Sequence, residues 1–191
     1  MNYYDENAEE FFENTVNADM TPHYKKFLEA IPEGCHILDA GCGSGRDTLK
    51  FMEMGYEVTP LDASEKMCRL AAKYTHHEVI YLRFQYIQFK NMFDAIWASA
   101  SLLHVPSDEM DMVLSKLHDS LVDDGILYAS FKYGNYEGTR NGRYFTDLTE
   151  ETARKLFVRN NFEVLDTWIT EDVRKDRKEE KWVNILVKKI L

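Results

Sequence analysis

The sequence has little that would support a disulfide framework, a metal site or a membrane segment. Only three cysteines occur, at Cys35, Cys42 and Cys68, and no two of them have the C-x-x-C spacing of redox or zinc sites. No run of about 18 apolar residues is present, so we expect no membrane-spanning segment. The acidic start MNYYDENAEEFFENT lacks the apolar stretch of a signal peptide. These absences predict a cytoplasmic protein with reduced thiols.

Positive charge is also scarce. The 191 residues include 23 Lys and Arg against 33 Asp and Glu, a formal net charge of −10. Proteins that bind nucleic acid need a broad basic surface, because neutralised phosphates supply most of the affinity. We therefore expect no nucleic-acid partner, although a local basic patch is compatible with the composition.

Repeats, low-complexity tracts and flexible linkers are missing, so we expect one domain spanning residues 1–191. Short apolar runs alternate with amphipathic segments, which predicts an α/β doubly wound, mostly parallel sheet. The final two strands have no helix between them and should pair antiparallel at one edge. Strands are expected at 35–40, 56–62, 79–82, 93–99, 125–131, 162–170 and 182–190, and helices at 7–16, 19–30, 46–54, 64–73, 107–121 and 149–158.

Three features depart from this regular pattern. Pro60 lies inside an expected strand and cannot donate a ladder hydrogen bond, so we expect a bulge or an early strand end near Asp62. Residues 132–148 are too many for a tight link between a strand and a helix. The stretch EDVRKDRKEEK (171–181) mixes five acids with five bases, which predicts a solvated hairpin tip and no binding patch.

A glycine-rich loop, DAGCGSGR, follows the first expected strand, with glycines at alternate positions 41–45. Glycines there allow positive φ and close approach of a ligand, and open parallel sheets bind ligands beyond the carboxyl ends of their strands. The dinucleotide pattern G-x-G-x-x-G fails, because Arg46 and Thr48 stand where its third glycine is needed. The spacing also excludes a Walker loop.

Two carboxylates indicate which ligand suits the loop. Asp39 ends the first strand, where it would repel a pyrophosphate but favour a cationic amino group. Asp62 ends the second strand, the position at which an acid accepts hydrogen bonds from both ribose hydroxyls. The two carboxylates therefore indicate a ligand with an ammonium group, a ribose and no phosphate. S-adenosylmethionine has these features.

With these motifs the chain resembles a class I S-adenosylmethionine-dependent methyltransferase, nearest to the small bacterial tellurite-resistance-type and generic methyltransferase-domain proteins. The resemblance covers about residues 20–190. It rests on ILDAGCGSGRD, YEVTPLDAS, FDAIWASASLLHVP and LVDDGILYASF. It implies a Rossmann-like seven-stranded sheet in the order 3-2-1-4-5-7-6, with the last strand antiparallel and helices on both faces.

The resemblance also implies a set of cofactor contacts. The set is Asp39, Gly41, Cys42, Gly43, Asp62, Ala63, Phe84, Gln85 and Ala98, and Arg46 is added as a candidate partner of the cofactor carboxylate. The first four would contact the methionine moiety. Asp62 would hold the ribose with Ala63 beside the adenine, which Phe84 would pack and Gln85 would hydrogen-bond, in a stretch that lacks the family's usual acid. Ala98 would turn its carbonyl toward the sulfonium.

Several of these residues keep two interpretations. Cys42 is a small residue that fits the loop rather than a nucleophile, and Arg46 either pairs with the cofactor carboxylate or lies at the surface. His104 follows the fourth strand, where it either acts as a general base or packs its loop. A base is not required, because a sulfonium is a strong electrophile and alignment alone drives many methyl transfers.

Two segments could enclose the site. Residues 132–148 carry Arg140 and Arg143 among tyrosines that include Tyr133, and they form either the wall of a site for an anionic substrate or an ordinary surface hairpin. The N-terminal helices within 1–30 carry Tyr3, Tyr4, Phe11 and Phe12, and are expected to pack over the cofactor site.

Two motifs are absent after the fourth strand: the Asn/Asp-Pro-Pro-Tyr run of adenine and glutamine methylases, and the Pro-Cys pair of cytosine C5 enzymes. We therefore expect an enzyme that transfers the methyl group of S-adenosylmethionine to a small-molecule acceptor, with S-adenosylhomocysteine as the product. The acceptor could be anionic, and we expect no metal. The alternatives are a protein or RNA methyltransferase and a non-catalytic protein that binds S-adenosylmethionine.

Overall fold

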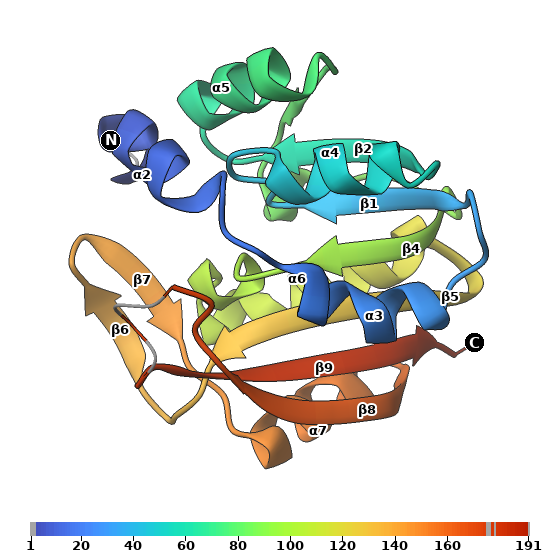
Figure 1. Cartoon of the computed structure of the whole chain (residues 1–191). Coiled ribbons are helices and arrows are strands. Elements are labelled where there is room, and N and C mark those ends of the chain that lie inside the picture. Colours follow the sequence, from blue (N-terminus) through green and yellow to red (C-terminus); the bar gives the residue numbers. More distant parts are fainter. Residues whose placement is uncertain (1–2, 175–176, 178, 191) are drawn as a thin grey trace.

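A seven-stranded sheet forms the centre of the computed structural model, which describes residues 3–174, 177 and 179–190. Its order is β3-β2-β1-β4-β5-β9-β8 (Figure 1). The strands are β1 (His36–Ala40), β2 (Glu57–Asp62), β3 (Ile80–Tyr81), β4 (Phe93–Ala98), β5 (Leu121–Lys132), β8 (Phe162–Glu171) and β9 (Lys181–Lys189). The first five are parallel, and β9 is antiparallel to both β5 and β8. The expected order and the antiparallel last strand are confirmed.

Helices cover both faces of this sheet. On one face α6 and α7 pack over Leu38 and Ile96, and on the other α3 and α4 pack over Ile37 and Trp97. Neighbouring residues of a strand point to opposite faces, so a strand covered on both sides becomes a continuous apolar run. The helices are α1 (Tyr3–Glu6), α2 (Ala8–Thr15), α3 (Thr21–Glu29), α4 (Arg46–Glu53), α5 (Glu65–Thr75), α6 (Ser107–Ser120) and α7 (Glu150–Arg159), with 3-10 turns η1 (Phe84–Tyr86) and η2 (Leu102–His104).

The strand β2 continues through Pro60 without the bulge or early end that the sequence predicts. The register with β1 is regular, with Asp39 opposite Pro60 and Ala40 opposite Leu61. The neighbour on the other side, β3, pairs only with Leu61 and Asp62. No ladder bond from β3 therefore requires the N–H that Pro60 lacks, and the expectation was wrong for that reason.

The segment 132–148 forms a small hairpin of β6 (Glu137–Arg140) and β7 (Arg143–Thr146), separate from the main sheet. Asn141 and Gly142 connect the two strands with φ of +48° and +77°, as a type I′ turn requires. In Figure 1 the arrows of β1, β2 and β4 point toward α2 and this hairpin, which stand at the carboxyl edge of the sheet. Within the described ranges, no helix has the length and apolar character that crossing a bilayer demands.

Candidate functional site

Two adjoining pockets open at the carboxyl edge of the parallel strands. The first pocket has a volume of about 670 Å³ and lies among the loops after β1, β2, β3 and β4. The second pocket, of about 630 Å³, lies between the loops after β1, β4 and β5, the β6–β7 hairpin and the β8–β9 connection. The residues that line both pockets form a shared wall, made of Tyr4, Phe11, Gly41, Gly43, Ala100, His104 and Arg143. This is the edge at which open α/β sheets bind ligands.

The three alternate glycines have different reasons to be glycine. All have positive φ, of +85° at Gly41, +53° at Gly43 and +79° at Gly45. A Cβ on Gly45 would lie 2.8 Å from the Thr75 side chain, so this glycine lets α4 pack against α5. Gly41 and Gly43 line both pockets, but a Cβ on Gly41 would lie 2.5 Å from the Ser101 Cβ, whereas a Cβ on Gly43 would lie 3.4 Å from the ring of Phe11. Gly43 is therefore the glycine whose backbone a ligand can approach, and Gly41 also makes room for the loop after β4.

The carboxylate of Asp62 lies in the first pocket and is fixed by backbone donors. Its Oδ2 accepts the Gly43 N–H at 2.9 Å, and its Oδ1 accepts the Ser64 N–H at 2.9 Å. Burial raises the pKa of Asp62 above its usual value, although these backbone hydrogen bonds lower it. Ala63 lines the same pocket. A carboxylate that is fixed in this way and lines a pocket suits a pair of ribose hydroxyls.

Two residues expected at the cofactor lie just beneath the pocket surfaces. Asp39 is 2% exposed and accepts the Thr48 hydroxyl at 2.5 Å, and it lines neither pocket. Burial raises its pKa, and the neighbouring carboxylate of Asp47 raises it further. Ala98 is fully buried, and the next two residues, 99–100, reach the second pocket instead. Contacts of Asp39 and Ala98 with the cofactor stay predictions.

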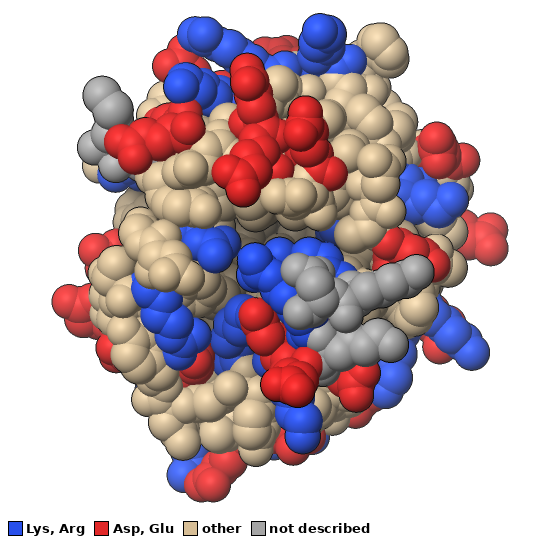
Figure 2. All heavy atoms as spheres, turned by 60° about the vertical axis from the view of Figure 1, so that its left-hand side comes forward, with Lys and Arg blue, Asp and Glu red and all other residues tan. Residues whose placement is uncertain are grey.

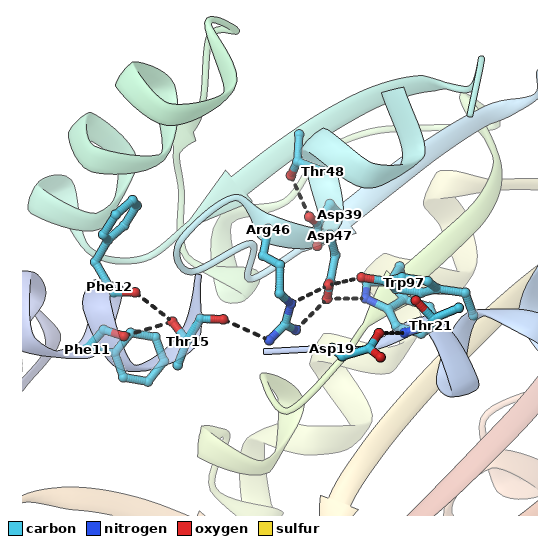
Figure 3. Close-up of polar contacts among 11 residues, drawn as sticks. Phe11, Phe12, Thr15, Asp19, Thr21, Asp39, Arg46, Asp47, Thr48 and Trp97 are labelled. Carbon is cyan, nitrogen blue, oxygen red and sulfur yellow. Dashed lines mark hydrogen bonds and ion pairs between the residues drawn. The ribbon is translucent and has the colours of Figure 1, made fainter. Parts of the chain in front are cut away.

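A buried network beside the glycine loop was not predicted from the sequence. The Arg46 guanidinium donates to both oxygens of Asp47, at 2.7 and 3.0 Å, and Asp47 also accepts from the Trp97 indole at 2.8 Å (Figure 3). The Tyr24 hydroxyl donates to Asp47 as well, at 2.6 Å. Burial alone would raise the pKa of Asp47, but Arg46 holds it below its usual value. Arg46 also donates to the Thr15 carbonyl at 3.2 Å. Its charge is thus compensated inside the protein, and a bond from Arg46 to the cofactor carboxylate stays a prediction.

The residues expected to contact adenine line the first pocket, and one of them already has a hydrogen-bond partner within the protein. Phe84 and Gln85 both face it from η1. The Gln85 amide donates to Glu109 Oε2 at 2.7 Å, so one of its two N–H groups can be engaged within the protein. Cys42 lines the second pocket, and burial raises the pKa of its thiol, which favours its interpretation as a small loop residue.

His104 lies in the shared wall and is held by two hydrogen bonds. Its Nε2 is 2.6 Å from the Tyr4 hydroxyl, and its Nδ1 is 2.6 Å from the Tyr144 carbonyl oxygen. Burial lowers its pKa to about 4, so the ring is neutral near pH 7. His104 is therefore packed in its loop, and it also lines each of the two pockets.

Positive side chains gather in the hollow of the second pocket, below an acidic rim (Figure 2). Most are paired: Arg140 with Asp147, and Lys132 with Glu180. Arg143 differs, because none of the described carboxylates pairs with it. Its Nε is buried without a hydrogen-bond partner among the residues that the structure describes. Tyr133, the remaining expected substrate residue, also lines this pocket.

The described part of 171–181 connects the antiparallel strands β8 and β9 with Glu171, Val173, Glu179 and Lys181 exposed, as expected of a hairpin tip, but it also lines the second pocket, and one of its acids is buried. Asp172 is 7% exposed and accepts hydrogen bonds from Arg174 and from the Trp182 indole at 3.1 Å. These bonds fold the connection back over β9. Positions 175, 176 and 178 lie outside the described residues.

Comparison with known proteins gives the family. A methyltransferase-domain model matches residues 37–125. An uncharacterized methyltransferase of Staphylococcus carnosus is 31% identical over 156 residues, which cover 76% of this chain and 75% of that protein. The chain belongs to the S-adenosylmethionine-dependent methyltransferases. S-adenosylmethionine is therefore its methyl donor, as the glycine loop and the two acids predict.

Solved methyltransferases share the fold of this one at low sequence identity. The 1,6-didemethyltoxoflavin-N1-methyltransferase of Burkholderia thailandensis superposes with a TM-score of 0.78 at 20% identity, over 98% of this chain and 84% of that one. TehB from Haemophilus influenzae gives a TM-score of 0.73 at 14% identity, over 96% of this chain and 67% of that one.

Proposed function

We propose that this methyltransferase holds S-adenosylmethionine in the first pocket and transfers its methyl group to a small anionic molecule in the second pocket. The first pocket supplies a fixed carboxylate at Asp62, bare backbone at Gly43 and an aromatic ring at Phe84. These groups suit a ribose, a close-lying amino-acid chain and a purine ring, respectively. The cofactor therefore fits the residues that are present.

The two pockets share a wall, which supports transfer between them. A methyl group passes in line from sulfur to the acceptor atom, so donor and acceptor must meet within about 3–3.5 Å. Gly41, Ala100 and His104 line both pockets, and the junction lies at these residues. The Burkholderia neighbour was solved with S-adenosylhomocysteine and its own small acceptor, which favours a small acceptor here as well.

Arg143 is the observation that supports an anionic acceptor. Arginine recognises carboxylate or phosphate groups with a fork of N–H donors, and a buried donor without a partner is costly. Arg143 lines both pockets, no described carboxylate neutralises it, and its Nε is unpaired within the described protein. An acidic group on the acceptor would satisfy both its charge and that donor.

The alternatives fit the structure less well. A protein or RNA methyltransferase would need a surface for its large partner, and a net charge of −10 disfavours RNA. A non-catalytic protein that binds S-adenosylmethionine would have no use for a second pocket of similar size beside the first.

The proposal is tested with methyl-labelled S-adenosylmethionine and a deproteinised metabolite extract that is separated by anion exchange after the reaction. We expect label in a small molecule that the column retains at neutral pH. Label in the unretained fraction would contradict an anionic acceptor. Label only in added protein or RNA would support the first alternative, and binding of S-adenosylhomocysteine without any transfer would support the second.

A further inference from the structure

The hydrogen-bond chain through the shared wall has a fixed direction. The Tyr144 carbonyl can only accept, so the His104 Nδ1 at 2.6 Å must carry a hydrogen. In a neutral imidazole the other nitrogen then has only a lone pair. The Nε2 therefore accepts, and the Tyr4 hydroxyl, also at 2.6 Å, must donate. A backbone carbonyl thus determines where the proton of Tyr4 points.

Because the single hydroxyl hydrogen of Tyr4 is engaged in the hydrogen bond to His104, the Tyr4 oxygen can only accept hydrogen bonds from other groups. The Arg143 guanidinium beside this hydroxyl lowers the pKa of Tyr4, as a donor and as a positive charge, against a larger upward effect of burial. Arg143 has no acceptor atoms, so it too can only donate to Tyr4. The contacts with His104 and with Arg143 are therefore both compatible with a Tyr4 oxygen that accepts a hydrogen bond from a ligand.

The N-terminal segment is held so that this oxygen stays at the junction. Tyr3 stacks its ring on the Arg143 guanidinium, 5.0 Å away. Asp5 accepts the Ser64 hydroxyl at 2.6 Å, next to the carboxylate of Asp62. Tyr4 packs edge to face on Phe11 at 5.0 Å, and both line the two pockets. Tyr4 therefore belongs to the wall that the two pockets share, and its hydroxyl is held there by His104 of the same wall.

We propose that Tyr4 is a specificity-determining residue that accepts a hydrogen bond from the methyl acceptor, and so selects a nucleophile that carries hydrogen, an N–H or O–H group. His104 is then a positioning residue that keeps the Tyr4 proton away from the acceptor. The inference rests on the proposed function, because the acceptor must occupy the second pocket. A nucleophile without hydrogen, such as a tertiary amine, would offer Tyr4 no donor.

The chemistry needs no proton on either residue to move. The lone pair of the acceptor atom attacks the methyl carbon, the carbon–sulfur bond breaks, and its electron pair returns to sulfur as a neutral thioether. The positive charge passes to the acceptor atom, which then loses its hydrogen to water. A hydrogen bond to Tyr4 orients the N–H or O–H, and with it the lone pair that attacks.

The test uses sinefungin, an analogue of the cofactor with a carbon-borne ammonium group in place of the methylsulfonium. That ammonium reaches toward the acceptor site and can only donate. We expect Tyr4→Phe to lower the ratio of sinefungin affinity to S-adenosylhomocysteine affinity by about tenfold or more in calorimetry, as for a lost hydrogen bond to a charged group. The control is Tyr74→Phe. Tyr74 of α5 packs on Phe12 of the N-terminal segment, and removing its hydroxyl should leave the ratio of the two affinities unchanged.

The outcomes separate this inference from the proposed function. An unchanged ratio in a folded Tyr4→Phe protein that still binds S-adenosylhomocysteine would overturn the role of Tyr4 alone. A folded wild type that binds neither compound would overturn the proposed function.

A second measurement checks the direction of the chain without any ligand. Long-range ¹H–¹⁵N spectra of the labelled protein at pH 7 should show His104 as the neutral tautomer with hydrogen on Nδ1. The Tyr4→Phe protein should keep this tautomer, because the Tyr144 carbonyl fixes it, while the Nε2 resonance shifts as its donor is lost. A hydrogen on Nε2 in the wild type, or an imidazolium, would overturn the inference.

Discussion

Asp62 and Asp47 are carboxylates beside the same glycine loop, but their partners give them different tasks. Asp62 is held by backbone N–H groups that include those of Gly43 and Ser64, and it faces the first pocket, where it can meet a ligand. Asp47 is saturated by Arg46, Tyr24 and Trp97 inside the protein. A substitution should therefore affect binding at the first position and folding at the second.

Replacing Asp62 with Ala should weaken binding of S-adenosylhomocysteine by roughly 1.5–3 kcal/mol for each charged hydrogen bond lost. The measurement is calorimetry on the folded variant. Glu65→Gln, on the exposed start of α5, changes charge by the same amount nearby and should bind as the wild type does. Equal affinities of Asp62→Ala and wild type would place the ribose elsewhere.

Replacing Asp47 with Asn should lower the free energy of unfolding by about 3 kcal/mol, because the Arg46 charge would remain in a largely buried place without its partner. Urea denaturation measures this change. Asp166→Asn, which removes one partner of an exposed pair with Lys26, serves as the control and should cost less than about 1 kcal/mol. Similar losses in both variants would contradict the structural role of Asp47.

His104 should make stability depend on pH in a defined window. Its pKa is lowered by burial from 6.5 to about 4, so between these values only the unfolded chain binds the proton. Its contribution to stability is complete above pH 6.5 and is lost as the pH falls toward 4. Between pH 7 and pH 5 the wild type should lose about 2 kcal/mol more than His104→Gln does in urea titrations. Parallel losses in the two proteins would show that His104 is not buried as a neutral ring.

The sequence predicted residues whose chemistry follows from their place on a strand. Asp62 and the glycines could be found because the end of a parallel strand is by itself a binding position. The partners of Asp47 could not be predicted, because Tyr24 lies in α3 and Trp97 in β4, and no spacing along the chain relates these residues to Asp47. The direction of the His104 hydrogen bonds depends on a carbonyl in β7, which no residue identity reveals.

At the scale of elements, the β6–β7 hairpin shows how two similar arginines come to differ. Arg140 lies across its own hairpin from Asp147, whose side chain is 6% exposed, and it stacks on the Tyr136 ring at 4.0 Å. Arg143 instead lies beyond the turn, against Tyr3 of α1. The sequence predicted both arginines as candidate substrate ligands. It could not distinguish them, because the register of the hairpin decides which arginine pairs with Asp147, and the sequence pattern did not reveal that register.

Replacing Arg143 with Ala should reduce methyl transfer to the acceptor by at least about tenfold, with the affinity for S-adenosylhomocysteine within a factor of about three. Replacing Arg140 with Ala should instead destabilise the protein by about 2–3 kcal/mol, because Asp147 would be left buried and unpaired. Initial rates and urea denaturation measure the two effects. Loss of transfer from Arg140→Ala alone, at unchanged stability, would reverse the assignment.

Asp172 in the β8–β9 connection and Pro60 in β2 show where the sequence pattern of an element does not decide the structure of one residue. A stretch of alternating charges indicates solvent exposure only if those charges find no partners, and Asp172 finds Arg174 and Trp182. A proline interrupts a strand only where a neighbour needs its N–H, and β3 ends before Pro60. In both cases the deciding fact is the length or folding of a neighbouring segment.

At the scale of the whole molecule, the order of the sheet places both pockets at one edge. The loops after β1 and β4 contribute to both of them, because the chain leaves these neighbouring strands in the same direction. The same edge carries a group of positive side chains in a hollow of a protein whose net charge is −10 (Figure 2). Acids line the hollow too and pair with most of its positive charges, so Arg143, which no described carboxylate pairs with, is the charge that would attract an anionic ligand there, and salt should weaken the attraction.

Binding of the product cofactor should stabilise the whole fold. At 100 times its dissociation constant, S-adenosylhomocysteine should add about 2.7 kcal/mol and raise the melting temperature by roughly 5–10 °C in a chain of this length. NAD at the same concentration should cause no shift, since the glycine spacing does not suit a pyrophosphate. A shift with NAD and none with S-adenosylhomocysteine in thermal denaturation would contradict the cofactor.

The N-terminal segment 3–15 has a consequence for the timing of the catalytic cycle. Tyr4 and Phe11 belong to both pockets, and Asp5 ties the same segment to the loop after β2. One outward swing of this segment would therefore uncover both compartments together. Departure of the spent cofactor and departure of the methylated product would then be a single kinetic event, and its rate would set an upper limit on turnover.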